Sequence, residues 1–213
     1  MSPADVVIVS ARRTPIGAFL GALSPLTAVQ LGSAAIKAAV ESAGIAASDV
    51  QEVIMGCVLP ANLGQAPARQ AALGAGVPQG IPATTINKMC GSGLKAVMMA
   101  ADQIRSGTAS IVLAGGLESM SNAPYLLAKA RSGYRMGHGE VIDHMLRDGL
   151  QSPFDGKSMG CFADSTAARY NFTRAQQDAF ATESVRRAMA ALESGTFDTE
   201  VTPVTVKGQR ATP

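Results

Sequence analysis

The residue best placed for chemistry is Cys90, in the stretch INKMCGSGLKAVMMA at residues 86–100. It stands between a strand-like run and a helix-like run, with Gly91 and Gly93 beside it. The first N–H groups of a helix lack intrahelical partners and carry the positive end of the helix dipole, so they stabilise a thiolate and make it nucleophilic. The glycines allow a substrate or another backbone to approach closely. A cysteine that only fills space in the core is the alternative, and the residues alone leave both interpretations open.

The remaining cysteines and histidines carry weaker signals. Cys57 and Cys161 are assigned to packing or to incidental thiols, because an odd cysteine count without a C-x-x-C pair argues against a disulfide framework. His138 and His144 lie in a glycine-rich stretch far from the cysteines and are interpreted as exposed loop residues. Since a zinc site needs about four ligands at close spacing, we expect no metal and no resident cofactor.

Composition indicates a compact globular protein with an aliphatic core. Of the 213 residues, 47% are hydrophobic, 16% are charged and only 4% are aromatic. The net charge is +2, and no basic block is interleaved with aromatics, so nucleic acid is not an expected partner. No uninterrupted apolar run reaches the ~18 residues of a membrane span, and the first residues do not resemble a signal peptide. We expect a cytoplasmic protein.

The elements that position Cys90 alternate between strand and helix signals. The helix at 27–44 opens with a Thr27–Gln30 capping box and closes at Gly44. The helix that starts at Cys90 is apolar on nearly every side, so we expect it to be buried inside the protein. Strands are predicted at 5–11, 52–58, 83–86 and 109–116, and a further short helix at 66–76. This βαβαβαβ order predicts a layered α/β fold with a largely parallel sheet.

From about Ser119 the chain becomes richer in glycine, proline and polar residues, which predicts an excursion from the sheet that covers something. A long helix follows at 173–195, opened by a second capping box at Thr173 and Gln176. The run at 201–206 has the signature of a strand, yet no later element is available to pair with it. Fraying at a chain terminus is the ordinary explanation for this unpaired run. An incomplete chain is the more specific explanation.

The segment NKMCGSGLKAV resembles the thiolase active-site pattern N-x-x-C-[GA]-S-G-[LM]-x-[AS], and Cys90 falls on the family's acylated nucleophile. Other stretches are similar to the same family over nearly the whole chain: VSARRTPIGAFLGAL, GQAPARQAALGAGVP, GGLESMSNAPY, DGLQSPFDGKSMGCFADSTA and TRAQQDAFATES. The resemblance implies the N-terminal half of a thiolase fold, with a mixed sheet around a buried helix and an inserted loop domain. Residues 1–118 would form the α/β domain and 119–213 an incomplete loop domain that covers coenzyme A.

The implied activity is that of an acetyl-CoA acetyltransferase or 3-ketoacyl-CoA thiolase of fatty acid metabolism, with coenzyme A as substrate. The resemblance makes the Cys90 N–H an oxyanion donor and places Leu150 and Met159 against the pantetheine of coenzyme A. It also implies a homodimer or homotetramer. Ser158 stands where the family usually has histidine before that methionine, so this substrate contact differs and the substrate class is left open.

A larger departure is that three family motifs, N-E-A-F, G-H-P and C-x-G, do not occur in the sequence. They carry the histidine that activates the nucleophile and the second cysteine that moves the C2 proton. We therefore expect complete activity to need a C-terminal half, whether cleaved and retained, separately encoded or absent from the sequence considered. Two alternatives remain: a decarboxylating ketoacyl-synthase-like enzyme, and a non-catalytic fragment that acts as an assembly module through exposed apolar surface.

Overall fold

The computed structural model describes residues 5–206, and its body is built on a three-stranded sheet. The strand order is β2-β1-β3 and both pairings are parallel, with Val53 opposite Ala83 on one side and Leu113 on the other. The central strand is buried, as parallel strands covered on both faces must be. The strand bounds are Glu52–Gly56 for β1, Ala83–Ile86 for β2 and Val112–Gly116 for β3.

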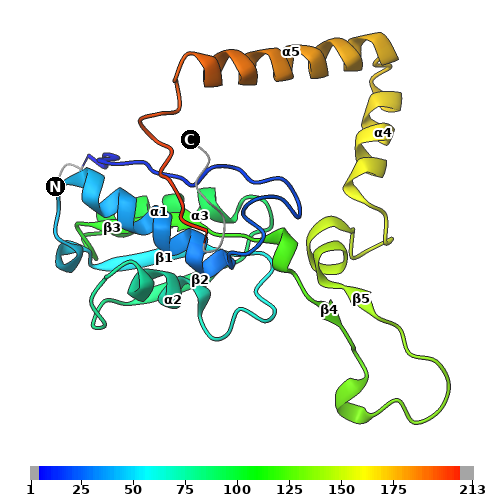
Figure 1. Cartoon of the computed structure of the whole chain (residues 1–213), viewed down its shortest axis with the longest axis horizontal. Helices are drawn as coiled ribbons and strands as arrows, with labels where there is room; N and C mark the ends of the chain where they lie inside the picture. Colours follow the sequence, from blue (N-terminus) through cyan, green and yellow to red (C-terminus); the bar gives the residue numbers. More distant parts are fainter. Residues whose placement is uncertain (1–4, 207–213) are drawn as a thin grey trace.

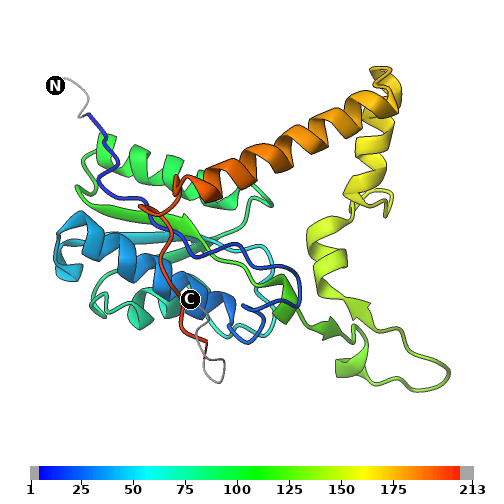
Figure 2. The same cartoon turned by 45° about the horizontal axis from the view of Figure 1, so that its top comes forward.

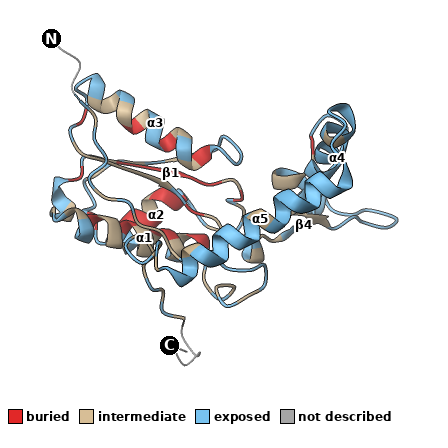
Figure 3. Cartoon of the chain, turned by 90° about the horizontal axis from the view of Figure 1, so that it is seen from above, coloured by how far each residue is buried: buried red, intermediate tan, exposed pale blue. Residues whose placement is uncertain are grey.

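Helices cover both faces of this sheet (Figure 1). The chain moves from β1 to one edge through α2 and then crosses to the other edge through α3. Because such crossovers are right-handed, this reversal places α2 and α3 on opposite faces. Seen from above, α3 lies on one side of the sheet and α1 and α2 lie on the other (Figure 3). The helix bounds are Ala28–Ala43 for α1, Pro67–Gly74 for α2 and Ser92–Arg105 for α3. The predicted layered α/β class is confirmed.

The core lies between the sheet and the α1–α2 layer. Ile36 of α1 and Val53 of β1 are almost fully buried, and both belong to one aliphatic cluster. The predicted capping box of α1 is present, with Gln30 N–H donating to Thr27 Oγ1 over 3.2 Å. Gly44 ends the helix in the left-handed conformation with φ of +67°, which glycine adopts without a Cβ penalty.

Two predicted strands are not formed. Residues 5–11 are extended but belong to no sheet, and Val7, Ile8 and Val9 are 70–78% exposed. In the run at 201–206, only Val201 forms a bridge, with Arg13. A strand needs a neighbour along its length. Within residues 5–206, the bridge at Val201 reaches only Arg13, two residues past the first run, and neither run pairs with β3. The mixed sheet that the resemblance implied is therefore not formed by residues 5–206.

The expectation that the helix after Cys90 is buried inside the protein was wrong for this chain. Only Ser92, Ala96 and Ala100 are buried, on the face that packs on β1 and β3. Leu94 is 69% exposed and Met98 is 52% exposed. An apolar helix becomes buried on all sides only where a second layer covers it, and the described residues provide one layer.

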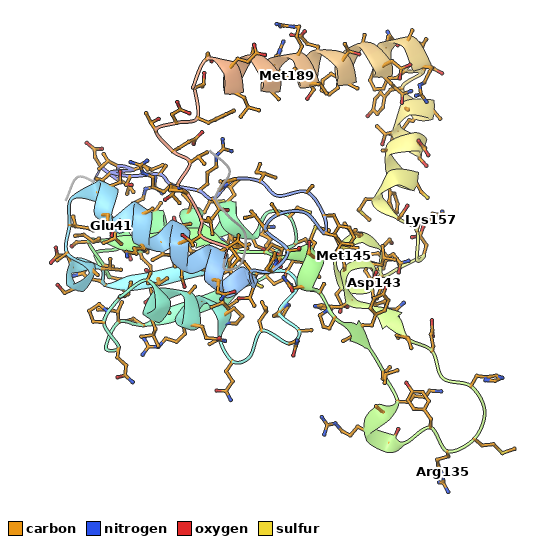
Figure 4. The ribbon with its side chains drawn as sticks, in the orientation of Figure 1. Glu41, Arg135, Asp143, Met145, Lys157 and Met189 are labelled. Carbon is orange, nitrogen blue, oxygen red and sulfur yellow. The ribbon has the colours of Figure 1, made fainter. Side chains whose placement is uncertain are left out.

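After β3 the chain leaves the body in a long excursion (Figure 2). Arg135 marks the tip of the loop between β4 and β5, and Asp143 and Met145 lie close together where η4 begins (Figure 4). The elements are η2 (Met120–Asn122), β4 (Tyr125–Leu126), η3 (Ala130–Ser132), β5 (Ile142–Asp143), the π-helix η4 (Met145–Leu150), α4 (Met159–Arg169) and α5 (Arg174–Glu193); η1 (Ala47–Asp49) lies in the body. Strands β4 and β5 pair antiparallel, and no residue of α4 or α5 is buried. Within residues 5–206, no helix has both the length and the apolar character to cross a membrane.

The segment before α1 fastens both ends of the excursion to the body. At the entry, Asn122 Nδ2 donates to the carbonyl oxygens of Ser24 and Leu26, each over 2.9 Å. At the exit, Arg13 forms an ion pair with Glu200 at 3.0 Å and stacks on the ring of Phe197 at 4.4 Å. The excursion is thus closed at its base, while α4 lies far from the sheet and α5 runs back toward the body (Figure 2).

Candidate functional site

Cys90 lies in a hollow at the carboxyl ends of β1 and β3, where α/β proteins bind ligands. The hollow has a volume of about 290 Å³. Its lining comes from the last residues of β1 and β3, from the residues just after these strands, and from the turn and first residues of α3: Gly56, Val58, Met89, Cys90, Ser92, Gly93, Gly116, Leu117 and Glu118. Three elements distant in sequence therefore converge on one thiol.

Glycines bring the first turn of α3 directly onto the sheet. A Cβ added to Gly56 would lie 2.5 Å from Ser92 Cβ and 2.6 Å from the Ser92 carbonyl carbon. A Cβ on Gly116 would lie 3.5 Å from the Gly93 Cα. Backbone therefore packs on backbone at this point, and a side chain at Gly56 would push the turn that carries Cys90 away from the strand ends.

The turn before α3 is held by short polar side chains. Asn87 Oδ1 accepts from the Met89 N–H over 2.9 Å, and Ser92 Oγ both accepts from the Lys88 N–H at 2.8 Å and donates to the Met89 carbonyl at 2.6 Å. These bonds keep Met89 in a left-handed conformation with φ of +49°. A non-glycine residue held there indicates a tightly determined turn, and this one presents the next residue, Cys90, to solvent.

The helix itself begins two residues later than predicted, with Gly91 as its N-cap and Ser92 as its first residue. No side chain caps this end, so Cys90 precedes a helix start whose dipole still favours an anion. The arrangement offers an exposed thiol, an electropositive helix end and a hollow that can receive a carbonyl group. These are the features that a cysteine nucleophile requires.

Glu118 is a member of the hollow that sequence reasoning missed. Its Oε2 accepts from the Val58 N–H at 2.8 Å and its Oε1 accepts from the Leu59 N–H at 3.0 Å, so the carboxylate joins the ends of β3 and β1. A signal was available in GGLES, where an acidic residue stands two positions after the end of β3. Asn87 and Ser92 were missed as well, although both belong to the motif around Cys90.

Cys57 is a packing residue, as predicted. It is 2% exposed, and its Sγ lies 3.7 Å from Glu118 Oε1. Burial raises the pKa of the Cys57 thiol from 9.0 to about 12, and the negative charge of Glu118 adds to this effect. A protonated, buried thiol is a poor nucleophile. We therefore expect Cys57 to react more slowly than the exposed Cys90, although both lie near the same strand ends.

The predicted substrate contacts lie in the excursion and do not line the hollow at Cys90. Leu150 is half-buried at the end of η4, Ser158 is the N-cap of α4 and Met159 is its first residue, 49% exposed. An isolated antiparallel bridge joins Gln151 to Ser158 and brings these three residues into one small structure. Cys161 is exposed on α4, so it does not pack in a core.

The two histidines have different surroundings. His138 is exposed in the β4–β5 loop, as expected. The expectation for His144 was wrong, since it is only 4% exposed. Its Nδ1 lies 2.6 Å from Asp148 Oδ2, and its Nε2 lies 3.4 Å from the Ala61 N–H, in the loop that follows β1. The i, i+4 spacing with an aspartate one turn later was the signal that could have indicated this pairing.

The fold and the site define a class: an α/β protein that presents a cysteine from a helix start at the carboxyl edge of a parallel sheet. Comparison with known families gives the particular member of that class. The model of the thiolase N-terminal domain matches residues 6–212, so the chain belongs to the thiolase family.

Curated relatives agree with this assignment. The chain is 52% identical to acetyl-CoA acetyltransferase 2 of Arabidopsis thaliana over 213 residues, which is all of this chain and 53% of that protein. It is 53% identical to acetyl-CoA acetyltransferase of Escherichia coli K12 over 209 residues, covering 98% of this chain and 53% of that protein. The chain therefore spans about half the length of the curated relatives it matches.

Proposed function

We propose that the protein transfers acyl groups to and from coenzyme A, with Cys90 as the acyl acceptor. The observation that carries this proposal is the position of the thiol, exposed on a fixed turn at a helix start in the hollow at the strand ends. The relatives are named acetyl-CoA acetyltransferases, which supports acyl-CoA and coenzyme A as the substrates.

In the proposed reaction, the Cys90 thiolate attacks the 3-keto carbonyl carbon of a 3-ketoacyl-CoA. The bond between C2 and C3 then breaks, C2 takes up a proton to release acetyl-CoA, and the shortened acyl group remains on sulfur until the thiol of coenzyme A removes it. In reverse, two acetyl-CoA molecules condense to acetoacetyl-CoA. Each addition creates an oxyanion that needs a fixed donor. We assign one donor to the backbone N–H of Cys90, at the helix start.

Residues 1–118 form the proposed nucleophile domain and 119–213 the proposed covering domain. The bridge between Gln151 and Ser158 supports this assignment, because it holds Leu150, Ser158 and Met159 together as a small, partly apolar structure. Such a structure suits the thin chain of pantetheine, which offers amides as well as methylene groups. Ser158 in place of the usual histidine provides a hydroxyl where the family has an imidazole.

The rest of the enzyme is proposed as a partner of this chain. A histidine to activate the thiol and a second cysteine as acid/base would come from the half of the relatives' length that the chain does not span. The exposed apolar face of α3, with Leu94 and Met98, gives that half a surface to cover. We also propose a homodimer or homotetramer, a role in fatty acid metabolism and a cytoplasmic location, with which the three free cysteines are consistent.

The test is acetyl transfer from isotope-labelled acetyl-CoA, with the site located by peptide mass spectrometry. We expect one acetyl group per chain on Cys90, and no acetylation of the Cys90→Ala and Cys90→Ser variants. A label that persists on Cys90→Ala would contradict the assignment. The intact mass of every polypeptide in the purified protein, measured under denaturing conditions, shows in the same preparation whether a second chain or a longer chain supplies the missing groups.

A second candidate function is an assembly module without catalysis. The exposed apolar residues Val7, Ile8 and Val9, together with the exposed face of α3, favour it, since such surface binds other proteins. Acetylation of Cys90 by acetyl-CoA would show that the protein is more than an assembly module. A single 21.8 kDa species that binds no acetyl group would support it.

A further inference from the structure

The side chain of Glu118 continues the connection between β1 and β3 beyond the end of the sheet. The last backbone bond between these segments runs from the Leu117 N–H to the Gly56 carbonyl, over 2.9 Å. Past this point the backbones separate, and the Glu118 carboxylate takes over by accepting from the N–H groups of Val58 and Leu59 at 2.8 and 3.0 Å. Hydrogen bonds to an ionised carboxylate are about twice as strong as neutral ones.

The segment held in this way forms part of the Cys90 site. Val58 and Glu118 both line the hollow that contains Cys90, and Leu59, 5% exposed, anchors the same loop in the interior. Loops that leave strands are ordinarily the mobile part of an α/β protein. Here two charge-assisted bonds fix one wall of the hollow relative to the strand ends on which the turn of Cys90 packs.

We propose that Glu118 is a positioning residue for acyl transfer at Cys90: it fixes the wall formed by Val58, so that a bound thioester carbonyl is held at the thiol. The proposal rests on the function proposed above. Both carboxylate oxygens already accept backbone hydrogen bonds, so Glu118 acts through the loop that it holds and does not take the substrate proton. Misplacement of reacting groups by about 1 Å can lower a rate about 100-fold.

A neighbouring thiol reports on the same carboxylate independently of catalysis. Cys57 Sγ lies 3.7 Å from Glu118 Oε1, and the carboxylate adds to burial in raising the pKa of Cys57. Removal of Glu118 therefore frees the loop and favours the Cys57 thiolate. Alkylation of Cys57 is expected to become at least about tenfold faster in Glu118→Ala at pH 9, because both access and thiolate fraction increase.

The experiment measures acetyl transfer from acetyl-CoA to Cys90 in the purified protein with every polypeptide that copurifies. The variants are Glu118→Ala, Glu118→Gln and, as a matched control, Glu52→Ala at the amino end of β1, where the carboxylate accepts, among residues 5–206, only from Thr84 Oγ1 at 3.3 Å. In Glu118→Ala we expect the maximal rate to fall about 10- to 100-fold, while the half-saturating acetyl-CoA concentration changes less than about threefold. Glu52→Ala should keep the wild-type rate.

Two further readouts separate positioning from other roles. Sodium formate can occupy the two vacated N–H groups, so it should restore part of the rate in Glu118→Ala and leave the wild type unchanged. The rate of Glu118→Gln should keep the wild-type pH profile. A folded Glu118→Ala with a wild-type rate would overturn the proposal, as would the loss of one ionisation from the Glu118→Gln profile, which indicates an acid/base role.

Failure of the proposed function gives a different result. If wild-type Cys90 accepts no acetyl group, acyl transfer is wrong, and the Cys57 alkylation rates still decide whether Glu118 holds the loop. Faster Cys57 alkylation in Glu118→Ala, reversed by formate, supports the structural part of the proposal. An unchanged Cys57 rate overturns it.

Discussion

Helices α1 and α5 begin and end with the same local signals, but α1 is partly buried in the fold and α5 is not. Each opens with a threonine–glutamine capping box, Thr27 with Gln30 and Thr173 with Gln176, and each is followed by a glycine in the left-handed conformation. Helix α1 packs on α2 and buries Ala28, Gly32, Ile36 and Val40, whereas α5 lies in the excursion and carries no buried residue. Capping therefore decides where a helix begins and ends, and packing decides whether its apolar face contributes to stability.

The largest expected effect is a difference between one buried and one exposed aliphatic residue. Ile36 of α1 is 2% exposed and Leu192 of α5 is 69% exposed. Ile36→Ala should lower the free energy of unfolding by about 3 kcal/mol, because it removes core contacts and leaves a cavity. Leu192→Ala should change it by less than about 0.5 kcal/mol. Urea unfolding measures both, and equal losses would show that α5 is packed in solution.

The next effect concerns the packing of α3 on the strand ends. Gly56→Ala places a methyl group 2.5 Å from Ser92 Cβ, so we expect a loss of about 2 kcal/mol and a displaced turn at Cys90. Gly80→Ala is the control, because a Cβ there meets nothing within 4 Å. Thermal unfolding of the two variants gives the comparison. A Gly56→Ala variant as stable as Gly80→Ala would contradict the close backbone packing described here.

A smaller effect follows from the buried thiol of Cys57. Its pKa is raised from 9.0 to about 12 in the folded protein, so the unfolded chain loses this proton first. The contribution to stability is fully present below pH 9 and is lost as the pH rises towards 12. At pH 10 the loss is about 1.4 kcal/mol. Unfolding free energies at pH 8 and pH 10 should show a smaller decline for Cys57→Ala than for the wild type, and an unchanged decline for Cys161→Ala.

Sequence patterns predicted the body well because its elements carry local signals. The capping boxes, Gly44 and the runs that became β1 and β2 follow from rules that involve neighbours in the chain. The pattern at 5–11 was equally strand-like, yet a strand there needs hydrogen bonds from a distant segment, and among the described residues the nearest bridge is at Arg13, two residues beyond the run. The apolar surface of α3 likewise indicated burial, but it could not show that only one layer covers this helix.

The candidate site was predictable in its centre and not in its surroundings. Cys90 could be identified from its position before a helix and from the glycines beside it. Glu118 and His144 have local sequence signals, but their loop partners could not be predicted, because these are N–H groups of residues 58–61, which only the folded loop brings near them. Side chains that bind the backbone of distant loops leave no periodic signal in the sequence.

The central claim is that the site, and not exposure alone, distinguishes Cys90. Cys90 in the body and Cys161 in the excursion are both exposed, so they form an internal comparison, with buried Cys57 as the slow reference. The most direct test is the initial rate of iodoacetamide labelling of each cysteine at pH 7, followed by peptide mass spectrometry. We predict that Cys90 is labelled at least about tenfold faster than Cys161. Equal rates at these two residues, or faster labelling of Cys161, would contradict the account.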